Sequence, residues 1–148
     1  MTIKYNNVFI EDAYTICGNY ENDGPLSKYF DKKYEKDLYF GEKSWEQAEV
    51  HLLKEANINI LKKNKLKEED IDLLISGDLQ NQIAASNYMA REFNIPFLGI
   101  FEACSTSGEG LAIGSTYIEG GFAKKILVST SSHNMAAEKQ FRNPTEYG

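Results

Sequence analysis

The chain has 148 residues, of which 42% are hydrophobic and 12% aromatic, so it can bury a core but is short enough for at most one domain. Its 22 acidic and 16 basic residues give a net charge of −6, which argues against nucleic-acid binding, since that function needs a basic stripe. The two cysteines, Cys17 and Cys104, are far apart in the sequence, and their positions match neither a disulfide framework nor the ligand spacing of a zinc site. We expect no metal ion and no cofactor. We expect a soluble chain, because no apolar run approaches the ~18 residues of a membrane span.

The first part of the chain predicts one strand, a long loop and one helix. Apolar residues at 8–10 and 13–17 predict a strand or bent pair of strands, and residues 18–43 an ordered loop with a short helix near 26–34. Ser44 begins the clearest helix, because Ser44 and Gln47 fit a capping box, and we expect this helix to end near Asn64. Its predicted inward stripe has a spacing of three or four and consists of Trp45, Ala48, Leu52, Ala56 and Ile60.

The middle of the chain alternates between strands and helices. The mostly apolar residues 71–76 predict a strand covered on both faces. Residues 82–93 predict a helix, whose expected inward side chains are Ala85, Tyr88, Met89 and Phe93. Residues 96–101 predict a third strand, which breaks at residues 102–107 and continues as a helix.

That helix, at about 105–119, is rich in glycine and has no broad charged face. A helix without a polar side is normally buried all round, and glycines allow close approach of neighbouring backbones. We therefore expect a central helix enclosed by the fold, with Cys104 at its buried mouth. Residues 125–130 predict the fourth strand, and residues 135–148 look like neither a helix nor a strand.

This order predicts an α/β fold with a mainly parallel sheet. Ligands of such sheets collect at the carboxyl ends of the strands, and polar clusters follow the later strands here. Asp78, Cys104 and His133 each lie at a predicted strand end. Their coincidence is the strongest functional indication in the pattern.

Each of these side chains has a structural and a functional interpretation. Cys104 is either a small buried residue or a pocket residue, where the helix N-terminus favours its thiolate. His133 serves as a base for that thiol, as a pocket residue or as a structural side chain, whereas His51 is assigned to the helix surface. Asp78 either caps the helix after it or lines the pocket, and Ser105 caps or lines the same corner.

Motifs over nearly the whole chain resemble the stage V sporulation protein AD family. They are FEACSTS at 101–107, GFAK at 121–124, SSHN at 131–134, RNPTEYG at 142–148, DGPL at 23–26, KSW at 43–45, IDLL at 71–74, GDL at 77–79 and NQ at 81–82. The resemblance implies a thiolase-like layered fold of two similar halves, of which residues 1–148 form the N-terminal half. Catalytic thiolase relatives use a cysteine at the position of Cys104 as acyl nucleophile and take histidine, asparagine or a further cysteine mostly from the second half.

The resemblance also implies a function. The family binds dipicolinic acid (pyridine-2,6-dicarboxylate) and supports its uptake into the developing spore, without catalysis. We expect Asp78, Cys104, Ser105 and His133 to contact this ligand, with Asp78 accepting from a protonated ligand group or meeting a chelated calcium ion. The implied partners are other proteins of the same sporulation transport system and a second copy in a homodimer. The implied location is the cytoplasmic side, at the spore inner membrane through those partners.

Two other hypotheses stay open. A thiolase-like or ketoacyl-synthase-like acyltransferase would use Cys104 through a thioester. A plain α/β interaction domain would have no small-molecule site. A covalent adduct on Cys104 after exposure to an acyl-CoA favours the enzyme, whereas heat on titration with dipicolinate favours the binding protein.

Overall fold

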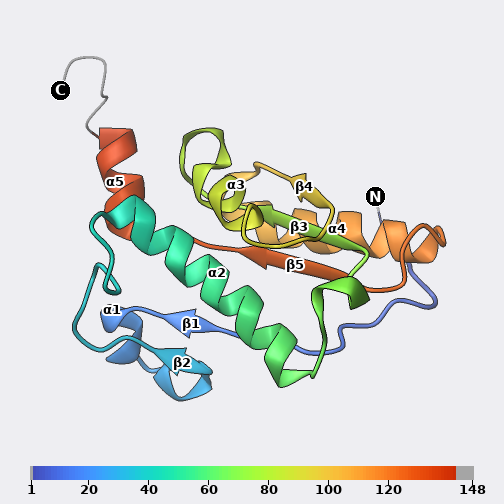
Figure 1. Cartoon of the computed structure of the whole chain (residues 1–148), viewed down its shortest axis with the longest axis horizontal. Coiled ribbons are helices and arrows are strands. Elements are labelled where there is room, and N and C mark those ends of the chain that lie inside the picture. The colour runs from blue at the N-terminus through green and yellow to red at the C-terminus, as the bar shows by residue number, and fades with distance from the viewer. Residues whose placement is uncertain (1, 143–148) are drawn as a thin grey trace.

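A three-stranded parallel sheet lies at the centre of the structure, a computed structural model that describes residues 2–142 (Figure 1). The strands are β3 (Leu73–Gly77), β4 (Phe97–Gly99) and β5 (Ile126–Thr130), in the order β4-β3-β5. Ser76 of β3 lies opposite Gly99 and Ser129 in the register. The predicted alternation of strands and helices therefore gives the expected parallel sheet.

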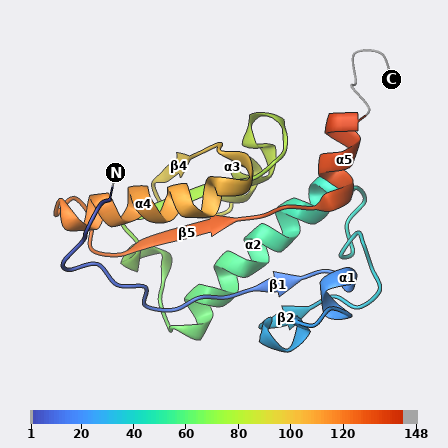
Figure 2. The same cartoon turned by 180° about the vertical axis from the view of Figure 1, so that it is seen from behind.

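Helices cover both faces of this sheet. They are α1 (Asn19–Asn22), α2 (Trp45–Lys63), α3 (Ala84–Ala90), α4 (Thr106–Glu119) and α5 (Asn134–Arg142), with short 3₁₀ helices at Ser27–Tyr29, Glu68–Asp70, Asn81–Ile83 and Ala103–Ser105. Successive side chains of β3 point to opposite faces. Leu74 packs into the core formed with α2 and α3, whereas Ile75 faces α4. Figures 1 and 2 accordingly show α2 in front of the sheet in one view and α4 in front in the other.

Helix α2 begins and ends where the sequence predicts. The Ser44 hydroxyl accepts a hydrogen bond from the Gln47 main-chain N–H at 3.2 Å, and Asn64 is the C-cap. The buried face, however, is rotated from the predicted stripe and consists of Ala48, Glu49, Leu53, Asn57 and Leu61. Leu52, Ala56 and Ile60 are only half-buried and line an open groove against residues 8–16.

The prediction of a first strand at 8–10 and 13–17 is mostly wrong. Only β1 (Ile16–Cys17) is a strand, and it pairs in parallel with β2 (Lys32–Lys33) outside the main sheet. In this segment, main-chain N–H groups that would pair with a neighbouring strand donate to aspartate side chains instead. The N–H of Ala13 donates to Asp12 and that of Thr15 to Asp31, each at 2.8 Å.

Other predicted elements differ in detail. The short helix expected near 26–34 is only the 3₁₀ turn Ser27–Tyr29, and the helix expected at 82–93 is α3, which begins after left-handed residues Gln82 and Ile83. Ala85 and Met89 are buried as predicted, Phe93 is partly buried, and Tyr88 is exposed. The stretch after residue 134 does form a helix, α5, whereas residues 143–148 lie outside the described part of the chain.

Helix α4 is covered on one side only, which corrects the expectation of an enclosed helix. Its buried residues are Thr106, Gly110 and Gly114, which face the sheet. A Cβ atom on Gly110 would lie 2.6 Å from Cγ1 of Val128, so this glycine sets the close packing of helix on strand. On the other side Leu111 and Tyr117 are 45% and 40% exposed, because the sheet covers only the glycine face.

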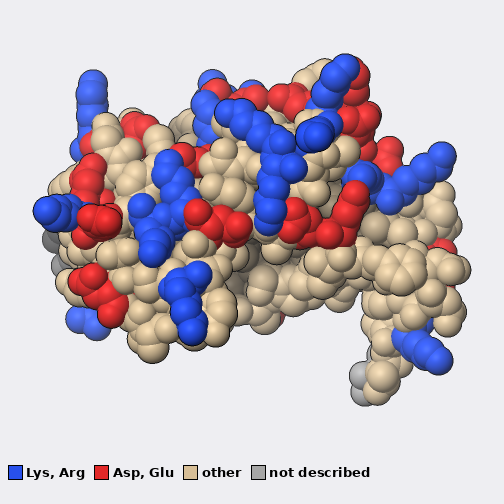
Figure 3. Space-filling view, turned by 90° about the horizontal axis from the view of Figure 1, so that it is seen from below, with Lys and Arg blue, Asp and Glu red and all other residues tan. Residues whose placement is uncertain are grey.

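Charges of both signs are mixed on the surface. On the face in Figure 3, lysine and arginine side chains alternate with aspartate and glutamate rather than forming a basic stripe. Examples of the ion pairs are Lys54 with Glu92 and Lys139 with Glu46. Within residues 2–142, none of the helices combines the length and the apolar character needed to cross a membrane.

Candidate functional site

The carboxyl ends of the three sheet strands meet at one edge, as the sequence predicts. The Thr130 hydroxyl donates to the Gly77 carbonyl at 3.0 Å and joins the ends of β5 and β3. A Cβ atom on Gly77 would lie 2.2 Å from the Ile100 carbonyl oxygen and 2.6 Å from the Thr106 methyl group. Glycine at 77 therefore lets the chain after β4 and the first residue of α4 pack directly on the end of β3.

Asp78, at this edge of the sheet, has the structural role of the two that the sequence allows: it caps the helix that follows. Its side chain is 1% exposed, and both carboxylate oxygens accept main-chain hydrogen bonds, from Gln80 at 2.9 Å and from Ser86 at 2.7 Å. These contacts fix the turn between β3 and α3 and cap the first turn of α3. The carboxylate is thus directed into the protein.

Glu49 is a buried carboxyl group that the sequence analysis missed. It is 0% exposed, accepts from the Gln80 side-chain amide at 2.9 Å and from the Ser131 hydroxyl at 3.0 Å. Burial raises the pKa of Glu49, and the nearby Asp78 carboxylate raises it further, against these two hydrogen bonds. Its only sequence signal is the four-residue spacing with Leu53, which places it on the buried face of α2.

His133 is also buried, against the loop before α2. Its Nε2 atom lies 2.8 Å from the Leu38 carbonyl oxygen, and its ring meets the Phe40 ring edge-on at 5.7 Å between centroids. Its Nδ1 atom lies 3.4 Å from the main-chain N–H of Ala136 in the first turn of α5. Both ring nitrogens therefore have structural partners.

Cys104 and Ser105 lie on the outside, at the start of α4. Both are exposed, which corrects the expectation that the thiol lies at a buried mouth. The Ser105 hydroxyl donates to the Glu102 carbonyl at 2.8 Å, and no side chain of the described residues caps α4. Ala103, directly before Cys104, has a left-handed backbone (φ 47°), an unfavourable conformation for a residue other than glycine.

The four predicted residues thus divide into two groups. Asp78 and His133 belong to a buried polar cluster around Glu49, whereas Cys104 and Ser105 border an open helix N-terminus. The main-chain N–H groups of Ser105 and Thr106 already donate to the carbonyls of Glu102 and Ala103, so what this terminus offers an anion is the positive end of the helix dipole. In the described part of the chain, no group of three or more His, Cys, Asp or Glu side chains is arranged to hold a metal ion.

One hollow reaches residues 130–132, directly before His133. It is a groove of about 600 Å³ between residues 8–16, α2, α4 and β5. Its lining is mostly apolar and includes Leu52 and Ile60, the half-buried stripe of α2. The groove therefore explains why that stripe is apolar without being part of the core.

Comparisons with known proteins agree with the motifs. The profile of the family described as stage V sporulation protein AD (SpoVAD) matches residues 1–148. The chain is 52% identical over 141 residues to the stage V sporulation protein AD of Bacillus subtilis (strain 168), which is 95% of this chain and 41% of that relative.

A solved structure gives the fold. The chain is similar to 3-oxoacyl-[acyl-carrier-protein] synthase III from Aquifex aeolicus VF5, with a TM-score of 0.52 and 20% sequence identity over 62% of this chain and 30% of that one. At this identity the likeness concerns the fold alone, which is the predicted thiolase-like layered fold. The chain spans less than half the length of its curated relative, and it belongs to the stage V sporulation protein AD family.

Proposed function

We propose that this sporulation protein binds dipicolinic acid at the N-terminus of α4 and supports its uptake into the developing spore. The observation that carries the proposal is the open first turn of α4, flanked by the exposed side chains of Cys104 and Ser105. Dipicolinate carries two carboxylates, and the positive end of a helix dipole favours such an anion. Family membership supports the assignment to sporulation.

The described residues do not supply a base for acyl transfer by Cys104. A nucleophilic thiol needs a base within hydrogen-bond reach. The chain has two histidines, and both have other partners: His133 faces the Leu38 carbonyl, and His51 lies between Glu42 and Tyr34 on α2. The described residues therefore place no imidazole beside Cys104, and the acyltransferase alternative would take its base from the second half of the fold.

The proposal also changes the expected role of two residues. We propose that Asp78 and His133 stabilise the site without contacting the ligand. Asp78 fixes the turn after β3, against which the start of α4 packs, and His133 fixes the chain after β5. A ligand contact to Asp78, directly or through a chelated calcium ion, would require its two main-chain hydrogen bonds to be given up. Cys104 and Ser105 are the side chains that we propose to contact the ligand.

Calorimetry with dipicolinate tests the proposal. We expect saturable heat with the 148-residue chain, less with benzene-1,3-dicarboxylate, and none when Cys104→Trp or Ser105→Trp fills the start of α4. Asn7→Trp is the matched control, because Asn7 is exposed and contacts Glu119 at the opposite end of α4. Binding by the Trp variants at wild-type strength would refute this site. A covalent adduct on Cys104 after exposure to an acyl-CoA would favour the acyltransferase instead.

We further propose that the protein forms a homodimer and reaches the spore inner membrane, on its cytoplasmic side, through other proteins of the same transport system. The exposed Leu111 and Tyr117 on α4 support an additional partner surface on that helix. Sedimentation velocity tests the dimer, with Leu111→Glu expected to give monomers. A monomeric wild-type chain at high concentration would contradict it.

A further inference from the structure

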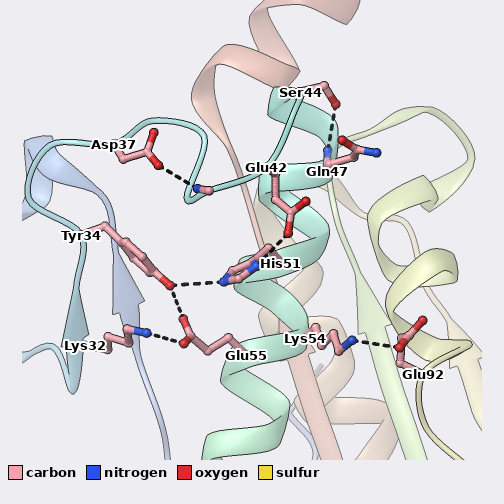
Figure 4. A network of polar contacts seen from close by, with 11 residues as sticks. Lys32, Tyr34, Asp37, Glu42, Ser44, Gln47, His51, Lys54, Glu55 and Glu92 are labelled. Atoms are coloured by element: carbon pink, nitrogen blue, oxygen red, sulfur yellow. Dashed lines mark hydrogen bonds and ion pairs between the residues drawn. The ribbon is translucent and has the colours of Figure 1, made fainter.

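The two histidines of the chain hold the same loop from two sides. We call residues 35–41 the strap; they connect β2 to α2. His51 of α2 contacts the residues at both ends of the strap, Tyr34 and Glu42, as Figure 4 shows. His133, after β5, contacts the middle of the strap through the Leu38 carbonyl and the Phe40 ring. The strap therefore depends on two imidazole groups.

The contacts of His51 determine its protonation state. The Tyr34 hydroxyl lies 2.8 Å from Oε2 of Glu55 and 3.3 Å from Nε2 of His51, but it has only one proton to donate. Glu55 also pairs with Lys32. Burial alone would raise the pKa of Glu55, but the contacts with Lys32 and Tyr34 outweigh burial and hold this pKa below its usual range. Glu55 is therefore a carboxylate, which can only accept.

It follows that Tyr34 donates to Glu55 and accepts from His51. Nε2 of His51 must then carry a proton. Nδ1 lies 3.1 Å from Oε1 of Glu42, a second carboxylate, so it must carry a proton as well. His51 satisfies both ends of the strap only as an imidazolium, and the charges of Lys32, His51, Glu42 and Glu55 then balance.

His133 has the opposite requirement. Its Nε2 atom donates to the Leu38 carbonyl, while Nδ1 accepts from the Ala136 N–H, so the ring has one proton and no charge. The first turn of α5 carries the positive end of the helix dipole, which disfavours an imidazolium there. The charged groups around it are Glu49, which lies near the main chain of His133, with Asp78 beside it, and the Glu46–Lys139 ion pair between α2 and α5.

We propose that the strap is a proton-dependent latch that closes when His51 is charged and His133 is neutral. Loss of the His51 proton removes the bond to Tyr34 or to Glu42 and frees one end of the strap. Protonation of His133 removes its acceptor from Ala136 and places a cation at the start of α5. In either case the strap loses one of the contacts that hold Leu38 and Phe40 in place. The Tyr34–Phe40 ring contact, with 4.6 Å between centroids, couples the two histidines.

The single tryptophan of the chain reports on this latch. Trp45 stacks on Tyr39 of the strap, with ring centroids 5.9 Å apart and planes 26° apart. We expect the Trp45 emission of the closed strap in the middle of the range from about pH 5 to 8, in which histidines change charge, and its loss at both ends. His51→Gln cannot replace both contacts of the imidazolium and should show the emission of the open strap at every pH, whereas His133→Asn, which gains no charge, should lose the change on the acidic side. Tyr29→Phe, at an exposed tyrosine outside the network, should keep the wild-type profile.

An emission that is constant over this range, or a His51→Gln variant with both changes intact, would overturn the proposal. If His133→Asn fails to fold, imidazole ¹⁵N spectra of the wild-type chain decide the question. At the pH where the strap is closed, both nitrogens of His51 and only Nε2 of His133 should carry protons. A neutral His51 or a charged His133 in the closed strap would refute the latch.

Discussion

The main-chain N–H of Ser86 donates a 2.7 Å hydrogen bond to Oδ2 of Asp78, which links the end of β3 to the first turn of α3. The turn between them contains Gln82 and Ile83 in left-handed conformations, with φ of 59° and 48°. Such residues cost about 1–3 kcal/mol each and persist only where other contacts fix them. The buried carboxylate of Asp78 supplies two such contacts.

Removal of this carboxylate should destabilise the protein. Asp78→Ala should lower the free energy of unfolding by about 1–3 kcal/mol, because two buried N–H groups lose their acceptor. Asp78→Asn keeps one acceptor oxygen and should lose less. Urea denaturation measures both, with exposed Glu35→Ala as a control expected within about 0.5 kcal/mol of wild type. A wild-type stability of Asp78→Ala would show that the residue is not structural.

Stability should also depend on the protonation of Glu49. Burial raises the pKa of Glu49, so the folded state keeps this proton to a higher pH than the unfolded state does. Its contribution to stability is therefore fully present below the unfolded pKa, about 4.3, and decreases as the pH rises through the folded pKa. Glu49→Gln carries no such dependence, and its stability relative to wild type should increase with pH over this window.

Glu46, one turn earlier in α2, provides a control with the opposite sign. Burial alone would raise the pKa of Glu46, but the ion pair with Lys139 outweighs burial, so the pKa of Glu46 is lowered. Its stabilisation is present above the unfolded pKa and disappears as the pH falls, so Glu46→Gln should lose stability relative to wild type as the pH rises. Urea denaturation at several pH values measures both variants, and parallel slopes would contradict the assignment.

Local chemistry made parts of the fold predictable. The Ser44 cap of α2 depends on residues only three apart, and the three sheet strands are short apolar runs bounded by polar loops. The rotation of α2 was not predictable in this way. Its buried face includes Glu49 and Asn57, whose partners, Ser131 and Met89, are far away in the sequence.

The candidate site shows the same limit. The sequence placed Asp78, Cys104 and His133 at strand ends, and the strand ends do meet at one edge of the sheet. The directions of the side chains depend on partners that no local pattern identifies, such as the Leu38 carbonyl, 95 residues before His133. The left-handed backbone at Ala103, directly before the exposed Cys104, is likewise not revealed by a sequence of small residues.

The two glycines near the start of α4 should respond to alanine with opposite signs. Gly110→Ala places a methyl group 2.6 Å from Cγ1 of Val128, a stiff β-branched side chain, and should destabilise the protein by about 1–3 kcal/mol. Gly108→Ala meets nothing within 4 Å and should stabilise it by up to about 1 kcal/mol through helix propensity. Urea denaturation of the pair separates packing from propensity. Equal effects would mean that α4 does not pack on β5 through Gly110.

The two cysteines should differ sharply in reactivity. Burial, and then the carboxylate of Glu21, raises the pKa of the Cys17 thiol, which lowers the fraction of reactive thiolate. Cys104 is exposed at the helix N-terminus, so Ellman's reagent should modify one thiol rapidly in the native chain and the second only after unfolding in guanidinium. Cys104→Ser should remove the rapid phase, and Cys17→Ala should leave it unchanged. A rapid phase that survives Cys104→Ser would mean that Cys17 is accessible, and an absent rapid phase in the wild type would mean that Cys104 is covered.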